Sequence, residues 1–303
     1  GSFEWRGLSL RSAAMWSTRQ HLGAFGRQLR QTRPRLACRG ISQTLADPTA
    51  WNQAPAVITT LPNGVRVATR ETFSEVSSVG VYINAGTRDE RKDTHGAAKL
   101  VEALALTGTK KRPKAALASE IESMGATVNM TTGREQTAYT MSVMKSDVKQ
   151  GMDILGDLVT STGISNLAKE KDGIIRSLNE LETPTRTVID DRLHACAFRD
   201  SSLGFAGTGP FDGAESLTEA QLKAYVDSTY TAENMVIAAT GPVKHEEIVK
   251  LATGAFGSVK AGTPLPPAEK PYFCGAELLY RNDEMGGTAY ISVGWEAVPW
   301  KSP

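Results

Sequence analysis

The chain of 303 residues lacks several features that would indicate a particular class of protein. It has no run of about 18 apolar residues, so we predict no membrane-spanning helix. It has only three cysteines, Cys38, Cys196 and Cys274, whose scatter excludes a disulfide framework and a Cys-x-x-Cys metal pair. The composition is otherwise ordinary, with 40% hydrophobic and 22% charged residues, as is typical of a soluble protein with one large domain or two small ones.

Acidic residues are almost missing from the first 45 positions, although the whole chain has a net charge of only +1. Residues 1–45 hold eight Arg, no Lys and only Glu4, a net charge of +7, whereas the remainder has 26 basic and 32 acidic residues, a net charge of −6. Such a segment is typical of a mitochondrial presequence, and a nucleic-acid-binding arm is the alternative. We interpret residues 1–14 as an upstream extension, residues 15–45 as the presequence, and Arg39–Ser42 as the neighbourhood of its cleavage.

Beyond the linker that contains Pro48 and Pro55, short strands and helices follow one another in mixed order. The pair Asn63-Gly64 between two apolar runs predicts a β-hairpin, and Thr218 with Gln221 forms a capping box that predicts the start of a helix. Strands are predicted at residues 56–61, 65–70, 77–85, 126–132, 137–145, 234–240 and 287–298. Helices are predicted at residues 96–106, 114–124, 146–159, 167–182, 183–198, 218–230 and 245–256. This order favours an α+β fold over a regular βαβ alternation.

Several short motifs carry a resemblance to a known family. They read Asn-Gly-x-Arg-Val at 63–67, Ala-Gly-Thr-Arg at 85–88, Gly-Ala-Ala at 96–98, Gly-Thr-Lys-Lys-Arg at 108–112 and Arg-Glu-Gln-Thr at 134–137. Over about residues 56–303 the chain resembles the mitochondrial processing peptidase β subunit and core subunit 1 of respiratory complex III, within the inverted zinc-motif peptidases. The resemblance implies a mostly antiparallel sheet with helices packed on one face, the first half of a two-half, clam-like chain.

The resemblance also assigns a candidate site to the helix at 96–106. Active members carry His-x-x-Glu-His there, in which the two His bind zinc and the Glu is the general base. The corresponding residues here are Lys99, Glu102 and Ala103, and the third ligand position falls on Ser177. An ammonium and a methyl group offer zinc no lone pair, and Glu180, three residues beyond Ser177, could not hold the metal alone.

From these positions we expect that the chain binds no metal or other cofactor and has no catalytic residue, with Glu102 as a vestigial base. We therefore expect that it is not an enzyme. Lys99 and Glu102 lie at positions i and i+3, so their side chains share one face of the helix. We predict that Lys99 pairs with Glu102 as a charge substitute for the metal, with Glu180 as a second candidate partner. His194 is interpreted as a core or cap histidine.

The resemblance leaves three functions open. We favour a non-catalytic structural core subunit of complex III (ubiquinol–cytochrome c reductase), peripheral to the mitochondrial inner membrane on its matrix side. The alternatives are a processing peptidase β-type subunit and an inactive partner subunit that binds presequences. The expected partners are other complex III subunits and a second core or α-type subunit, with no nucleic acid.

The expected domain organisation follows the same resemblance. Residues 1–45 are the extension and presequence, and residues 46–262 form the N-terminal α+β domain. Residues 263–286 are a linker, because four prolines lie within 263–271. Residues 287–303 are expected to begin a truncated second domain.

Overall fold

The computed structural model describes residues 55–91, 93–180, 186–199, 201–205, 215–266, 270–279 and 289–298. The predicted presequence, residues 1–45, lies outside the described residues, as do parts of the predicted linker. The division into domains therefore stays a prediction.

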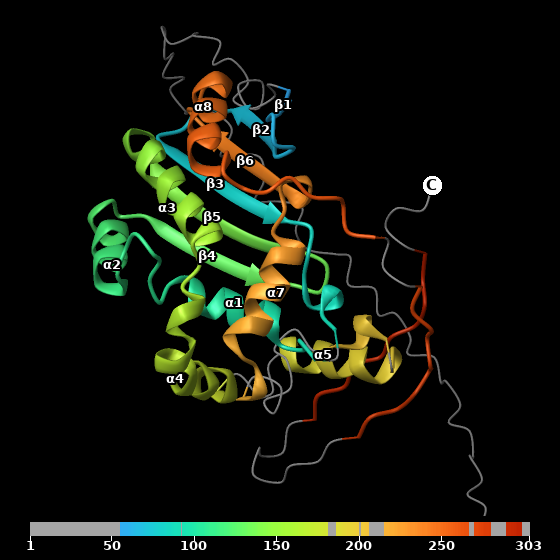
Figure 1. Cartoon of the computed structure of the whole chain (residues 1–303). Coiled ribbons are helices and arrows are strands. Elements are labelled where there is room, and N and C mark those ends of the chain that lie inside the picture. The colour runs from blue at the N-terminus through green and yellow to red at the C-terminus, as the bar shows by residue number, and fades with distance from the viewer. Residues whose placement is uncertain are drawn as a thin grey trace, which may run out of the picture. The chain divides into compact units, whose positions relative to one another are not determined.

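The described part of the chain is organised around one sheet of six strands (Figure 1). The strands are β1 (Val57–Thr60), β2 (Arg66–Glu71), β3 (Val76–Ile83), β4 (Thr127–Thr132), β5 (Thr137–Met144) and β6 (Met235–Gly241). Their order across the sheet is β1-β2-β6-β3-β5-β4, and every pairing is antiparallel except the parallel pairing of β2 with β6. The predicted α+β fold with a mostly antiparallel sheet is confirmed.

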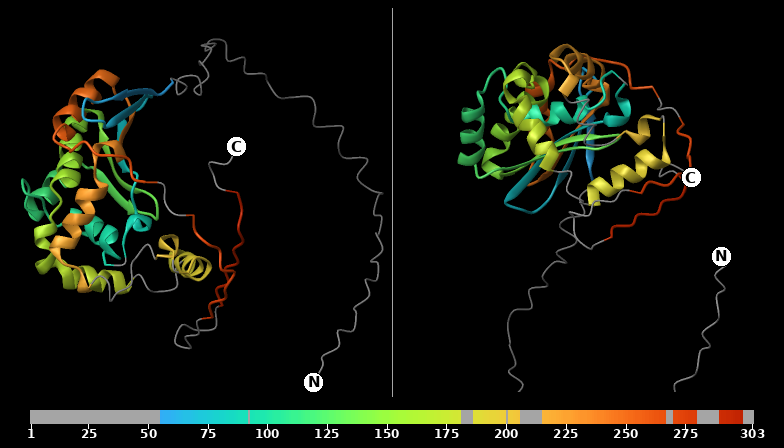
Figure 2. Two further views of the ribbon diagram at one scale, coloured as in Figure 1. Left: turned by 45° about the vertical axis from the view of Figure 1, so that its right-hand side comes forward. Right: turned by 90° about the horizontal axis from the view of Figure 1, so that it is seen from below.

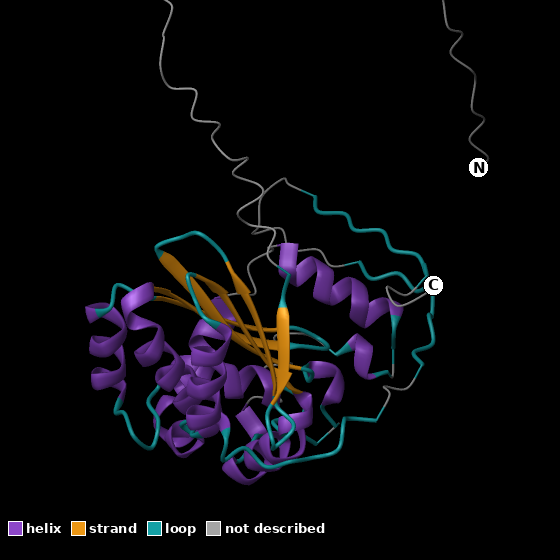
Figure 3. Cartoon of the chain, turned by 90° about the horizontal axis from the view of Figure 1, so that it is seen from above, coloured by secondary structure: helices purple, strands orange, loops and turns teal. Residues whose placement is uncertain are grey.

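The helices gather mainly on one side of this sheet, which Figure 3 shows from above. They are α1 (Ala97–Ala105), α2 (Lys114–Ser123), α3 (Val148–Thr160), α4 (Leu167–Glu180), α5 (Arg186–Ala197), α7 (Glu219–Thr229) and α8 (His245–Phe256). Alternation along the strands explains the arrangement, because successive side chains point to opposite faces. In β3, Val79, Val81 and Ile83 are buried, whereas Tyr82 between them is exposed on the other face.

The hydrophobic core lies between the sheet and its covering helices. Helices α3 and α8 pack against each other, and they contact the sheet at β5 and β2 respectively (Figure 2). Their close approach requires Gly156, because a Cβ placed there would lie 2.7 Å from the Cβ of Ala255. Leu155 and Phe256 are fully buried on these helices, and each such side chain contributes about 1.5–3 kcal/mol to stability.

Most predicted elements are found within a few residues of their expected positions. The Asn63-Gly64 hairpin is confirmed: β1 pairs with β2, and Gly64 has a φ of 104°, which a glycine adopts without strain. The capping box is also confirmed, because the N–H of Gln221 donates to the Thr218 hydroxyl and the Gln221 side chain accepts from the N–H of Thr218.

The strand expected at residues 287–298 is not found in its described part. Residues 289–298 have no regular secondary structure and are exposed. A strand is stabilised by a hydrogen-bonded neighbour, and no described strand pairs with this segment, so its alternating pattern is insufficient by itself. Within the described ranges no helix is long and apolar enough to cross a membrane.

Candidate functional site on helix α1

Helix α1 begins at a carboxylate that comes from outside the helix. Gly96 is its N-cap residue, with a left-handed φ of 91°. The N–H groups of Gly96 and Ala98 donate to the two carboxylate oxygens of Glu90, each at 2.8 Å, and Nδ1 of His95 donates to the same carboxylate at 3.0 Å. The Glu90 side chain is fully buried, so these bonds compensate its lost hydration and satisfy N–H groups that the helix cannot pair internally.

Lys99 and Glu102 form a largely covered ion pair on this helix. Their Nζ and Oε1 atoms are 2.7 Å apart, and the side chains are only 21% and 11% exposed. The other carboxylate oxygen of Glu102, Oε2, is buried and accepts no hydrogen bond. The predicted pairing of Lys99 with Glu102 is confirmed, whereas the side chain of Glu180 lies outside the described part of the chain.

Buried tyrosines lie close to the Glu102 carboxylate. The hydroxyl groups of Tyr139 and Tyr230 are 2.9 Å apart and are joined by a hydrogen bond. Burial raises the pKa of both tyrosines above the usual value, and the negative charge of Glu102 contributes to the rise in each case. The Glu102 carboxylate therefore lies near buried hydroxyl groups, on the core side of α1.

The positions that the resemblance assigned to zinc do not form a metal site among the described residues. Ala103 is partly buried against the core and has no donor atom, and Ser177 is exposed on α4. Lys99 donates a hydrogen bond to the Glu102 carboxylate. No group of three His, Cys, Asp or Glu side chains in the described ranges could hold a metal ion. The residues present do not fit a catalytic zinc, which needs three protein ligands.

The β4–β5 turn is fixed by ion pairs that reach across the structure. Arg134 pairs with Asp191 on α5 at 2.5 Å, and Glu135 pairs with Arg88, which precedes α1. Although Arg134 and Glu135 are adjacent in the chain, each pairs with a distant segment. This turn therefore connects α5 to the segment that leads into α1.

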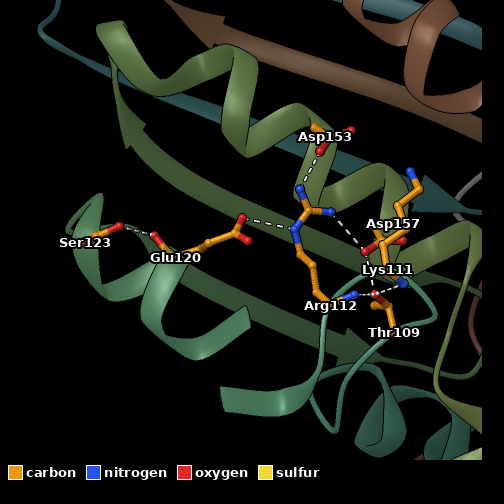
Figure 4. A network of polar contacts seen from close by, with 7 residues as sticks. All are labelled: Thr109, Lys111, Arg112, Glu120, Ser123, Asp153 and Asp157. Carbon is orange, nitrogen blue, oxygen red and sulfur yellow. Dashed lines mark hydrogen bonds and ion pairs between the residues drawn. The ribbon is translucent and has the colours of Figure 1, made fainter. Parts of the chain in front are cut away.

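Arg112, in the basic stretch of residues 110–112 that follows α1, is held by ion pairs to two other helices. Arg112 bonds Glu120 on α2 at 3.0 Å, and Asp153 and Asp157 on α3 at 2.5 and 3.0 Å (Figure 4). Burial by itself would lower the pKa of Arg112, but its hydrogen bonds to these three carboxylates raise it above the usual value. The hydroxyl of Thr109 donates to the same Oδ2 atom of Asp157 at 2.5 Å.

The sequence did not reveal the roles of Glu90, Tyr139 and Tyr230. Glu90 is an acidic residue just before an expected helix, which is a usable signal for a cap. The tyrosine pair has no local signal, because its members are 91 positions apart. The interpretation of His194 is consistent with the structure: it is partly buried, and its Nδ1 donates to the carbonyl of Asp190 at 2.7 Å.

Sequence comparison places this arrangement within a family. Residues 66–210 match the insulinase peptidase family M16, and residues 216–303 match the M16 inactive domain. The chain belongs to the M16 peptidase family. M16 relatives with similar sequences include the mitochondrial-processing peptidase β subunit of Blastocladiella emersonii, 37% identical over 248 residues, which cover 81% of this chain and 53% of that protein. The cytochrome b-c1 complex subunit 1 of Homo sapiens is 35% identical over 251 residues, which cover 81% of this chain and 52% of that protein.

Solved structures agree with the fold of this M16 chain. A protease from Helicobacter pylori has a TM-score of 0.62 at 19% identity, over 73% of this chain and 54% of that one. The first half of the periplasmic protease PqqL from Escherichia coli has a TM-score of 0.61 at 20% identity, over 71% of this chain and 49% of that one. The chain spans about half the length of the relatives it matches.

These comparisons correct one expectation. The prediction that the chain is not an enzyme is wrong, because residues 66–210 match a peptidase family and relatives with 35–38% identity are named as processing peptidase subunits. That prediction rested on Lys99, Ala103 and Ser177, which concern one metal site and do not decide the class of the protein. The absence of metal at those positions stays a prediction.

Proposed function

We propose that this chain acts as the β-type subunit of a heteromeric mitochondrial assembly. The supporting observation is its similarity, over about four-fifths of its length, to relatives named as subunits of two such assemblies, a processing peptidase and the cytochrome b-c1 complex. The structure is compatible with this role, because one face of the sheet is covered by helices and the other carries exposed side chains such as Tyr82 and Met144. An α-type or second core subunit is the proposed partner.

The processing peptidase is the first candidate assembly. The M16 peptidase match over residues 66–210 and the names of relatives from fungi, plants and animals favour it. In this assembly the chain would take part in removing presequences from imported proteins. Such presequences are basic and acid-poor, and the net charge of −6 on residues 46–303 is of the opposite sign.

The cytochrome b-c1 complex is the second candidate. The human relative favours it, and so does the ion pair between Lys99 and Glu102, whose short contact and low exposure suit a packed scaffold element. In that complex the chain would be a core subunit, peripheral to the inner membrane on its matrix side. Residues 15–45 would direct import in either case.

Isolation of the tagged full-length chain from mitochondria of a eukaryotic host separates the candidates. Co-purification with an α-type subunit as a soluble heterodimer that cleaves an Arg-rich presequence substrate would support the first. Co-migration with a detergent-solubilised complex that shows haem b and haem c absorption would support the second. A chain that remains in the cytosol, or is recovered from mitochondria without another subunit, would refute the proposal.

A further inference from the structure

The Glu102 carboxylate is buried with an incomplete set of hydrogen bonds. Its Oε1 atom accepts from Lys99, and its buried Oε2 atom has no hydrogen-bond partner. The tyrosine hydroxyls in its neighbourhood bond to each other. A carboxylate in such a place loses most of its hydration, so its charge requires a counter-ion close by.

Lys99 meets this requirement through its position on the same helix. It stands one turn before Glu102, and its ammonium group reaches the carboxylate at 2.7 Å. Its four-carbon stem is mostly covered, since only 21% of the side chain is exposed. The chain offers a matched comparison: Lys223 and Glu219 form an intrahelical pair on α7 at 3.5 Å, with 59% and 42% of their side chains exposed. An exposed pair of that kind adds little to stability, whereas a covered one matters when it is broken.

The residues at the position of this pair do not fit the metal ion that the family's motif implies. The position that would supply a ligand nitrogen instead supplies a cation, and Ala103 has no donor atom. We infer that Lys99 is a built-in counter-ion that takes the place of a metal ion beside Glu102. The positive charge at this site therefore belongs to a side chain of the protein and not to a bound ion. The inference concerns the metal alone and does not depend on which assembly contains the chain.

Denaturant unfolding of the full-length chain tests the counter-ion. Lys99→Met should reduce the folding equilibrium constant about a hundredfold, because it leaves a buried charge unpaired. Lys99→Arg, which keeps the charge, and the double variant Lys99→Met/Glu102→Leu should each remain within about tenfold of the unmodified protein. Lys223→Met should change the constant by less than about fivefold.

Four outcomes decide the inference. If Lys99→Met fails to fold while the double variant folds, the inference is supported, since the harm then comes from the stranded carboxylate. If Lys99→Met has no more effect than Lys223→Met, or if the double variant is as damaged as the single one, the pair is an ordinary surface or packing feature. Elemental analysis after incubation with zinc is the second readout: one zinc per chain that is lost in Glu102→Gln would overturn the inference.

Discussion

Replacing Arg112 by Met should destabilise the fold through a single buried carboxylate. Arg112 joins the loop after α1 to α2 and α3, and its side chain is only 13% exposed. Of its three acidic partners, Glu120 and Asp153 are partly or largely exposed and can be hydrated when Arg112 is lost. Asp157 is fully buried, and its Oδ1 atom already has no hydrogen-bond partner.

The magnitude follows from what remains at Asp157 after the change. The Thr109 hydroxyl would be its one remaining donor among the bonds described above, and a neutral donor does not balance a buried charge. Removing one partner of a buried ion pair costs about 3–5 kcal/mol, and the remaining Thr109 bond favours the lower end. For a protein of this size, about 3 kcal/mol lowers the melting temperature by roughly 6–12 °C.

Thermal and urea unfolding measure this effect, with two controls. Lys145→Met removes an exposed pair with Glu75, whose side chains are 56% and 67% exposed, and should cost less than about 1 kcal/mol. The double variant Arg112→Met/Asp157→Leu should recover most of the lost stability, because it removes the stranded charge. If Arg112→Met were no worse than Lys145→Met, or if the double variant were no better than the single one, the argument from buried charge would be refuted.

Two further predictions concern the tyrosines and the helix contact. Because burial raises the pKa of Tyr139 and Tyr230 in the folded protein, both contribute stability below about pH 10, and this contribution is lost as the pH rises through the folded-state pKa. Ultraviolet titration should show that part of the tyrosinate absorbance develops only on alkaline unfolding, and ionisation of every tyrosine near pH 10 without unfolding would contradict this. Gly156→Ala should destabilise the fold by about 1–3 kcal/mol, because the new Cβ would meet Ala255. The control Gly173→Ala on α4, where a new Cβ would have nothing within 4 Å, should be neutral or stabilising by up to about 1 kcal/mol. Equal effects of the two variants in calorimetry would show that α3 and α8 adjust freely.

The sequence predicted the elements that depend on local patterns. The hairpin at Asn63-Gly64 and the capping box at Thr218 are short-range features, in which neighbouring residues determine the backbone conformation. The pair of Lys99 and Glu102 was also predictable, because helical geometry alone puts positions i and i+3 on one face. The strand prediction was wrong over residues 289–298, because a strand there needs a neighbouring strand for its stability, and a local pattern does not contain that neighbour.

The surroundings of the site were less accessible from the sequence. Arg134 and Glu135 are adjacent in the chain, yet they pair with Asp191 and Arg88, which the fold brings in from either side. Likewise, the contact between Tyr139 and Tyr230 depends on packing between distant segments. Sequence patterns therefore identified the helix that carries Glu102, whereas the burial of that carboxylate required the three-dimensional structure.

The position of β6 within the sheet has a consequence for the order of folding. β6 lies between β2 and β3, and it joins them although it follows β3 by more than 150 positions. Until Met235–Gly241 has been synthesised, the β1–β2 hairpin has no partner that connects it to the β3–β5–β4 group. Contacts between such distant segments form slowly, because a long loop must close before they contribute. We therefore expect a chain that is still emerging from the ribosome, or is held in transit through a narrow pore, to contain two unjoined groups of strands until β6 arrives.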